Sequence, residues 1–313
     1  MSKAFKILAI DGGGFRGVYP AHLLKRIEKE FDVRWRDSFD LIAGTSTGSI
    51  IAASLALGKS ASEVLDIYSQ HGADIFHKCF RPRLGLLASK YSSTSLKRIL
   101  NDFFGDSKLG DIEIPLIIPA TDIANGCVHV FKSSYHNEFL RDKDVRVADA
   151  VLASCSAPTY FPPALLSGEK PYLLADGGLW ANCPSLVAAI DAKRRLGARL
   201  EDLRVLSLGT GKAKQFYPIK RFKRQSLFGW GFATRWRRGR FIEMLLNLQA
   251  ENASNMLGLL IEREQILRLN FESDKDLPLD SPDDLDDFLT RADRKFTHKS
   301  AKIEKFLLKG ETG

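Results

Sequence analysis

The 313-residue sequence has few cysteines and no long apolar run. Its four cysteines are widely spaced and form no C-x-x-C pair, which argues against a zinc site or a disulfide framework and fits reduced thiols. The longest apolar-rich stretch, residues 49–58, is far shorter than the roughly 20 residues of a membrane-spanning helix. The first residues lead directly into a strand-like run, without the apolar region and cleavage site of a secretory signal. We therefore expect a cytoplasmic protein that does not span a membrane.

Acidic residues are absent from one long segment. Residues 212–240 hold ten Lys or Arg and no Asp or Glu, which leaves a formal charge of −2 on the rest of a chain that totals +8. Because the excess is local, only this basic aromatic segment requires an anionic partner, and we interpret it as an excursion from the fold.

The basic aromatic segment has three interpretations. Its Lys and Arg would bind anionic lipid headgroups, at about 1 kcal/mol each. Its aromatic rings would instead stack on nucleic acid bases, or pack inward as a solvated loop. No DNA- or RNA-binding motif is recognisable, so a nucleic acid polymer is not expected and peripheral membrane contact is favoured.

Short apolar runs alternate with helical patterns along the chain. A strand is predicted at residues 5–10 and a helix at 19–31, and the same order returns at 39–43 and 49–57. The remaining strands are predicted at 114–120, 128–131 and 205–208, and the remaining helices at 96–104, 185–196, 241–261 and in a C-terminal helical segment through residue 306. This alternation predicts an α/β fold with a mainly parallel central sheet. No Pro-, Ser- or Gly-rich linker divides the chain, so residues 1–313 are predicted to form a single domain.

Seven apolar residues of the helix at 241–261 are predicted to be buried. They are Ile242, Leu245, Leu246, Leu248, Met256, Leu259 and Leu260.

Residues 44–48, Gly-Thr-Ser-Thr-Gly, match G-x-S-x-G between a predicted strand and a predicted helix. In that context the turn forces the serine out of the sheet, and the glycines allow the close approach of the backbone. Ser46 is therefore a candidate nucleophile. The alternative is an ordinary glycine-rich turn that caps the helix.

A second glycine-rich turn, Asp-Gly-Gly-Gly-Phe-Arg-Gly at residues 11–17, also follows a strand and opens a helix. Consecutive glycines let backbone N–H groups converge on one anion, either a developing oxyanion or a phosphate. The glycines also satisfy G-x-G-x-x-G, which leaves a nucleotide-binding α/β protein as an alternative. We predict that the N–H groups of Gly12, Gly13 and Gly14 form an oxyanion hole. Arg16 is predicted to orient the loop or to bind a lipid phosphate, and Asp11 to brace it.

Asp176 ends an apolar run and precedes two glycines, so its carboxylate is a candidate proton acceptor at a strand end. The alternative is an Asx turn, a common role for Asp before Gly. The six histidines are scattered, and none lies in a marked loop. If Ser46 is a nucleophile, Asp176 is therefore favoured as its base.

Taken in order, these motifs resemble those of the patatin-like phospholipases. The family's D-G-G-G-x-R-G corresponds to residues 11–17, its G-x-S-x-G to residues 44–48, and its D-G-G to residues 176–178. Residues 153–163 are similar to its A-S-x-A-x-P-x-x-F-P-P segment, and residues 208–211 to its L-G-T-G. The sequence departs at Cys183, where the family commonly has Asn.

The resemblance implies a three-layer α/β/α fold and lipid acyl hydrolysis by a Ser46–Asp176 dyad, without a metal or other cofactor. The substrate would be a membrane phospholipid. Overall similarity extends to bacterial patatin effectors of antiphage signalling, which implies a cyclic dinucleotide activator and action at the inner face of the membrane. A constitutive lipid acyl hydrolase is the alternative, and the sequence leaves open whether the chain forms a homo-oligomer.

Overall fold

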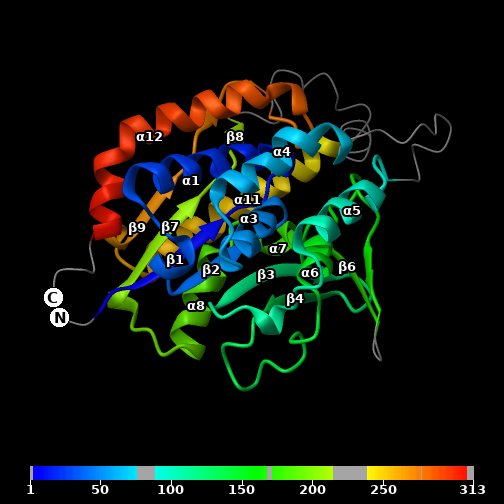
Figure 1. The fold of residues 1–313 in the computed structure, drawn as a ribbon, viewed down its shortest axis with the longest axis horizontal. Helices are drawn as coiled ribbons and strands as arrows, with labels where there is room; N and C mark the ends of the chain where they lie inside the picture. The colour runs from blue at the N-terminus through cyan, green and yellow to red at the C-terminus, as the bar shows by residue number, and fades with distance from the viewer. Residues whose placement is uncertain (1–2, 76–88, 168–170, 214–237, 276, 309–313) are drawn as a thin grey trace, which may run out of the picture.

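The computed structural model describes residues 3–75, 89–167, 171–213, 238–275 and 277–308 (Figure 1). An eight-stranded sheet has the order β5-β6-β3-β2-β1-β7-β9, with β4 also paired to β3. The strands are β1 (Phe5–Ile10), β2 (Leu41–Gly44), β3 (Leu116–Asp122), β4 (Cys127–Lys132), β5 (Ala164–Leu166), β6 (Tyr172–Asp176), β7 (Leu203–Leu208) and β9 (Ile266–Leu269). Pairing from β3 through β2, β1 and β7 to β9 is parallel, whereas β4, β5 and β6 pair antiparallel. The predicted α/β fold with a mainly parallel central sheet is confirmed.

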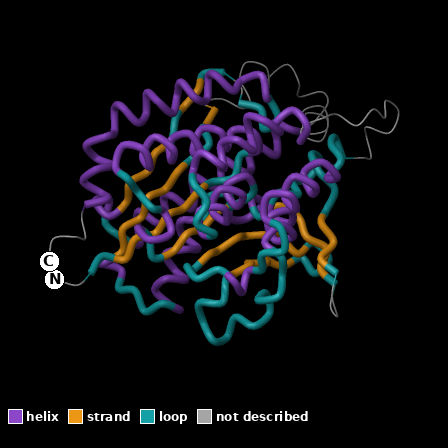
Figure 2. The backbone as a smooth tube through the Cα atoms, in the orientation of Figure 1, coloured by secondary structure: helices purple, strands orange, loops and turns teal. Residues whose placement is uncertain are grey.

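Helices cover both faces of this sheet (Figure 2). They are α1 (Val18–Phe31), α2 (Trp35–Ser38), α3 (Thr47–Ala56), α4 (Ala61–Ile75), α5 (Ser93–Phe104), α6 (Val147–Ser154), α7 (Gly178–Ala181), α8 (Ser185–Arg195), α11 (Arg238–Leu260) and α12 (Leu285–Leu308). Two short strands, β8 (Lys212–Ala213) and β10 (Glu272–Ser273), form a separate pair. The predicted strands and helices all occur, with ends shifted by a few residues. The elements that were not predicted are α2, α4, α6, α7, β5, β8, β9 and β10.

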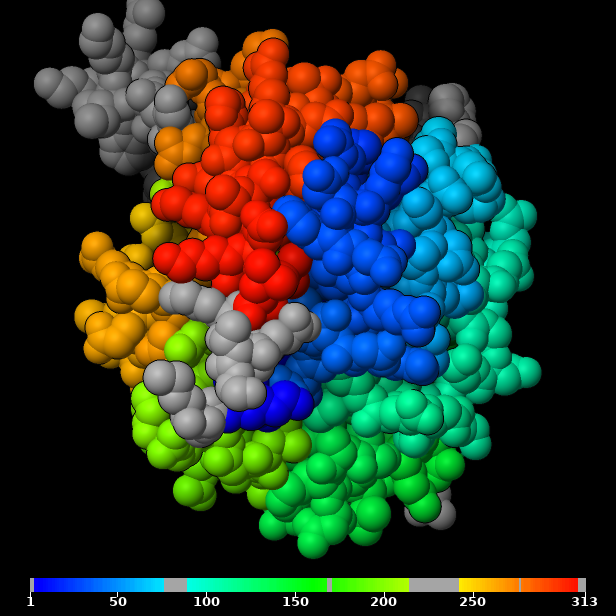
Figure 3. Space-filling view, turned by 60° about the vertical axis from the view of Figure 1, so that its left-hand side comes forward, coloured from blue at the N-terminus to red at the C-terminus, as the bar shows by residue number. Residues whose placement is uncertain are grey.

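The two faces of the sheet bury different sets of side chains because successive residues of a strand point to opposite sides. In β1, Leu8 packs into the core with α1, α3 and α12, whereas Ile7 packs into the second core with α8 and α11. In the space-filling view of Figure 3, α12 (red) lies against α1 (blue). The result is the three-layer α/β/α arrangement.

The prediction that apolar side chains of α11 are buried is partly wrong. Leu246 is buried, but Leu245, Leu248, Met256 and Leu259 are exposed, Leu259 by 84%. Among the described elements, α11 packs mainly on α7 and α8, which contact one side of the helix. The apolar side chains that α11 buries among its described residues are Leu246, Ala253 and Leu257.

The sheet brings the three sequence motifs to one place. Ile10 and Gly44 are paired residues at the ends of parallel strands, so the two glycine-rich turns leave the sheet side by side. Strand β4 lies along one edge of β3, which leaves the other edge to be shared by β2 at its start and β6 at its end. Because β2 is parallel to β3 and β6 antiparallel, their carboxyl ends point toward each other. Ala43 lies opposite Ile117 and Asp176 opposite Ala120, so Ser46 and Asp176 emerge into the gap between the two strands.

Candidate active site

Ser46 has a backbone conformation that side-chain-bearing residues rarely adopt, with φ 52° and ψ −127°. Such strain costs of order 1–3 kcal/mol and persists only where the surroundings enforce it. The glycines of the motif let neighbouring backbone segments pack close enough to hold this conformation. A Cβ on Gly48, for example, would lie 2.3 Å from the Ile10 carbonyl oxygen. The geometry is that of a nucleophile elbow, a serine raised between strand β2 and helix α3.

Hydrogen bonds to neighbouring elements hold this turn. The backbone N–H of Ser46 donates to Ser154 Oγ at 2.9 Å, and the Ser154 hydroxyl donates to the Pro119 carbonyl of β3 at 2.6 Å. The Thr45 hydroxyl donates to the Ala181 carbonyl of α7 at 2.6 Å. The elbow is therefore fixed to the elements that carry Asp176. Sequence reasoning missed Ser154, although it lies in the Ala-Ser-x segment that resembled the family motif.

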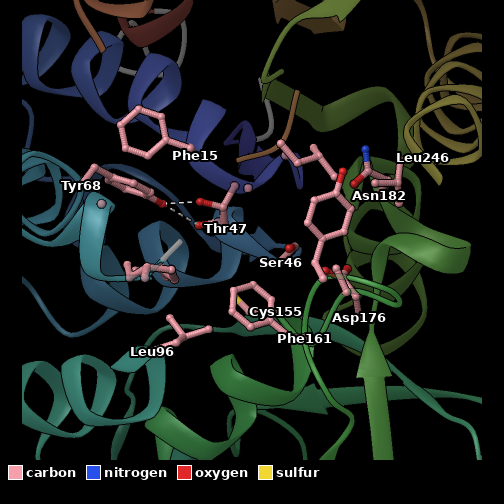
Figure 4. Close-up of a pocket in the computed structure, with 18 residues that line it drawn as sticks. Phe15, Ser46, Thr47, Tyr68, Leu96, Cys155, Phe161, Asp176, Asn182 and Leu246 are labelled. Carbon is pink, nitrogen blue, oxygen red and sulfur yellow. Dashed lines mark hydrogen bonds between the residues drawn. The ribbon is translucent and has the colours of Figure 1, made fainter. Parts of the chain in front are cut away.

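Asp176 lies beside Ser46 at the same pocket (Figure 4). Its side chain is buried, with the residue 3% exposed, and burial raises the pKa of its carboxyl to about 6. Hydrogen bonds from the Ser46 hydroxyl and from the Gly178 N–H, which lies 2.6 Å from Oδ1, oppose that rise in pKa. A carboxylate with this pKa is ionised at neutral pH and is a stronger base than an exposed Asp. The structure thus brings both candidate residues together.

The glycine-rich loop contributes fewer N–H groups to the pocket than predicted. The Gly12 N–H donates to the Asn182 carbonyl at 3.0 Å, so it braces the loop and is not available to an oxyanion. Gly13 and Gly14 line the pocket, and within the described part of the chain their N–H groups have no acceptor. Of the three glycines predicted to donate to an oxyanion, Gly13 and Gly14 therefore remain as candidate donors.

Arg16 lies inside the protein, at 2% exposure. Its Nε donates to the Gly13 carbonyl at 3.2 Å and its Nη1 to the Leu277 carbonyl at 3.1 Å. Both contacts are to backbone carbonyls, so of the two predicted roles this geometry favours orienting the loop.

Asp11 anchors the other end of the loop. It is paired with Arg268 of β9 through two hydrogen bonds, one of them 2.9 Å from Nη1 to Oδ1. The Asp11 side chain is 3% exposed, so its charge depends on this partner. The structure agrees with the predicted bracing role, and it adds Arg268, which no sequence motif marked.

The pocket beside Ser46 is lined mainly by apolar side chains. They belong to Phe15, Ile50, Ile75, Leu96, Phe161, Leu246 and Leu279. Among the residues that the structure describes, no histidine lines it, and no group of His, Cys, Asp and Glu there is arranged to hold a metal. The site accordingly combines a strained serine, a desolvated carboxylate and two unpaired amides with a surface suited to a hydrocarbon chain.

These features define a class of protein: α/β proteins with a nucleophile elbow after a central parallel strand. A family model described as patatin-like phospholipase matches residues 8–189. The chain belongs to this family, which confirms the family predicted from the motifs.

Named relatives are similar over most of the chain. A cGAMP-activated phospholipase of Pseudomonas aeruginosa is 35% identical over 210 residues, 66% of this chain and 62% of that protein. A cGAMP-activated phospholipase of Vibrio cholerae is 33% identical over 254 residues, 74% of this chain and 71% of that protein. A cUMP-AMP-activated phospholipase of Escherichia coli is 28% identical over 318 residues, 97% of this chain and 94% of that protein.

A solved structure shares the fold. The crystal structure of VipD from Legionella pneumophila matches 99% of this chain and 67% of that chain, with a TM-score of 0.50 and 12% sequence identity. At that identity the likeness supports the fold alone.

Proposed function

We propose that the protein is a serine lipid acyl hydrolase of the phospholipase A type, which cleaves fatty acyl esters of membrane glycerophospholipids. The observation that carries the proposal is the strained Ser46 beside the buried Asp176, at the end of an apolar pocket. The family and its named phospholipases support the same chemistry.

In this mechanism the Ser46 oxygen attacks the ester carbonyl while Asp176 accepts the hydroxyl proton. The Gly13 and Gly14 N–H groups stabilise the oxyanion, a contribution whose loss costs roughly 100- to 1000-fold per donor in other hydrolases. Asp176 then gives the proton to the departing lysolipid oxygen, and the acyl-enzyme remains. Water hydrolyses this intermediate, with Asp176 again acting as the base.

The dyad is tested by fatty acid release from phospholipid vesicles. We expect Ser46→Ala and Asp176→Asn to abolish release, and Ser69→Ala on α4 to leave it unchanged. Because Asp176 must be ionised to act as a base, the rate should rise with pH through about 6. Undiminished release by Ser46→Ala would end the proposal.

We further propose that a cyclic dinucleotide activates the enzyme, in bacterial antiphage defence. Relatives named as cGAMP-activated and cUMP-AMP-activated phospholipases support this. A titration of activity with both nucleotides separates the proposal from a constitutive enzyme, whose rate would not respond.

The alternative of phosphate bound by the loop at residues 12–17 is weakened, since the N–H groups of Gly12, Phe15 and Arg16 are bonded to protein carbonyls.

Access to a bilayer substrate requires peripheral membrane contact, which we propose at the inner face of the cell membrane. Most of the basic aromatic segment lies outside the described residues, but α11 follows it and exposes Leu245, Leu248, Met256 and Leu259. Among the described helices, none is long and apolar enough to cross a bilayer. Sedimentation with neutral and anionic vesicles tests the contact. Stronger binding to the anionic vesicles is expected, and equal binding to both would refute an electrostatic contribution.

A further inference from the structure

The side chain of Asn182 is a buried polar group for which the mechanism above has no use. The residue connects α7 to α8, lines the pocket and is 5% exposed. Its amide oxygen Oδ1 has no hydrogen-bond partner among the described residues. Figure 4 shows Asn182 on the same side of the pocket as Asp176. A buried acceptor without a donor is destabilising, so its retention beside a reactive site requires an explanation.

The position of this oxygen follows from the two glycines that pack against it. A Cβ on Gly12 would lie 2.4 Å from Asn182 Oδ1 and 3.1 Å from Ser46 Cβ, so these two atoms are at most 5.5 Å apart. A Cβ on Gly178 would lie 3.1 Å from Asn182 Oδ1 and 2.9 Å from Asp176 Oδ1, so the two oxygens are at most 6.0 Å apart. One water molecule that donates to both oxygens spans about 4.5 Å, since each such bond is about 2.8 Å long and the two O–H bonds are bent, and that span lies within the upper bound.

The chemistry of the reaction limits which donor can satisfy this oxygen. A fatty acyl chain and an ester carbonyl have no donor, and in the acyl-enzyme the Ser46 oxygen carries the acyl group and has no proton to donate. The hydrolytic water has two O–H groups, of which only one is needed by the base. We propose that Asn182 Oδ1 accepts the second O–H and so orients the water that hydrolyses the acyl-enzyme, a role that rests on the proposed function.

The step balances as follows. The water oxygen bonds to the acyl carbon while its first proton moves to Asp176, and the second O–H stays bonded to Asn182. The bond between the acyl carbon and the Ser46 oxygen then breaks, and that oxygen takes the proton back from Asp176. A fatty acid leaves and the free serine is restored. Asn182 therefore acts in deacylation and is not required for acylation.

Stopped-flow hydrolysis of p-nitrophenyl butyrate separates the two steps, because p-nitrophenolate is released on acylation. For Asn182→Ala we expect a burst of about one equivalent at a rate within twofold of wild type, followed by turnover slower by roughly 100-fold, the usual cost of a misplaced reactant. Hydroxylamine, a stronger nucleophile than water, should restore turnover. The control is Asn101→Ala on α5, which removes another buried amide oxygen without a partner in the described chain and should behave as wild type.

Two outcomes would overturn the role in deacylation. One is that Asn182→Ala slows the burst and the turnover equally, which would assign the side chain to ester binding or to packing. The other is that hydroxylamine gives no recovery. The backbone carbonyl of Asn182, which braces Gly12, is kept in this variant, and labelling of Ser46 by a fluorophosphonate reports a folded site. Failure of the proposed function gives a different result: a wild-type burst that persists in Ser46→Ala.

Discussion

Replacement of Asp176 by asparagine should make the protein inactive and more stable at neutral pH. The carboxyl is buried and its pKa rises from the ordinary 3.8 to about 6 on folding, so the fold disfavours its ionised form. Asparagine has the same shape, stays neutral, and keeps an oxygen that can accept from the Gly178 N–H, 2.6 Å from Oδ1 in the native protein. The variant should therefore remove the cost of the charge and little else.

The size and pH range of the gain follow from the shift in pKa. Two pKa units correspond to about 3 kcal/mol at 1.36 kcal/mol per unit. Below pH 3.8 the carboxyl is protonated in both the folded and unfolded states, and wild type and variant should be equally stable. As the pH rises from about 4 to 6, the unfolded state loses its proton first, so wild-type stability falls relative to the variant. Above about pH 6 the full difference is present.

Denaturant unfolding at pH 8 and at pH 4 measures this difference. We expect Asp176→Asn to increase the free energy of unfolding by up to about 3 kcal/mol at pH 8 and to change it little at pH 4. Lower stability than wild type at pH 8, or the same gain at both pH values, would refute the argument that burial of this charge raises the pKa.

Three further substitutions test the loop and the elbow. Gly14→Ala should lower activity by 100-fold or more, because Gly14 has φ +58° and its new Cβ would lie 2.2 Å from a carbonyl oxygen. The control is Gly197→Ala, which has φ +69° and open space around it and should cost only about 1 kcal/mol of stability. Arg268→Ala leaves the buried Asp11 unpaired and should destabilise the protein by about 3–5 kcal/mol in denaturant unfolding, unlike a double variant with Asp11→Asn. Ser46→Gly should abolish hydrolysis yet raise stability by about 1 kcal/mol, since glycine tolerates φ 52°, and a loss of stability would show that the turn is not strained.

Local patterns were enough to predict β1, α1, β2 and α3, the elements that flank the two glycine-rich turns. The apolar run at residues 5–10 and the glycines after it predict β1 and the turn that follows it. The motif at residues 44–48 likewise predicts a strained serine, because its glycines suit only a tight approach between backbones. The family followed from the order of these motifs.

Other features depend on contacts between distant residues and could not be predicted. The Gly12 amide turns toward the Asn182 carbonyl, a contact across 170 residues of sequence that no local signal encodes. Arginine is usually a surface residue, but Arg268 of β9 forms an ion pair with the buried Asp11. The leucines of α11 fit a buried pattern, yet within the described part of the chain Leu245, Leu248 and Leu259 are exposed. The prediction of a single domain over residues 1–313 stays a prediction.

Strand β3 supplies no reacting group, but β2 and β6 both pair with it along one edge. The number of residues along that edge therefore sets how far apart these two strands end. Ala43 and Asp176 are matched to Ile117 and Ala120, so the separation of nucleophile and base is measured by the rise of the few residues between those two positions. A one-residue deletion in that interval would draw the two chemical groups together by about 3.3 Å and invert the facing of every later side chain in the strand. The spacing of nucleophile and base thus depends on how many residues of β3 lie between the two strands that carry them.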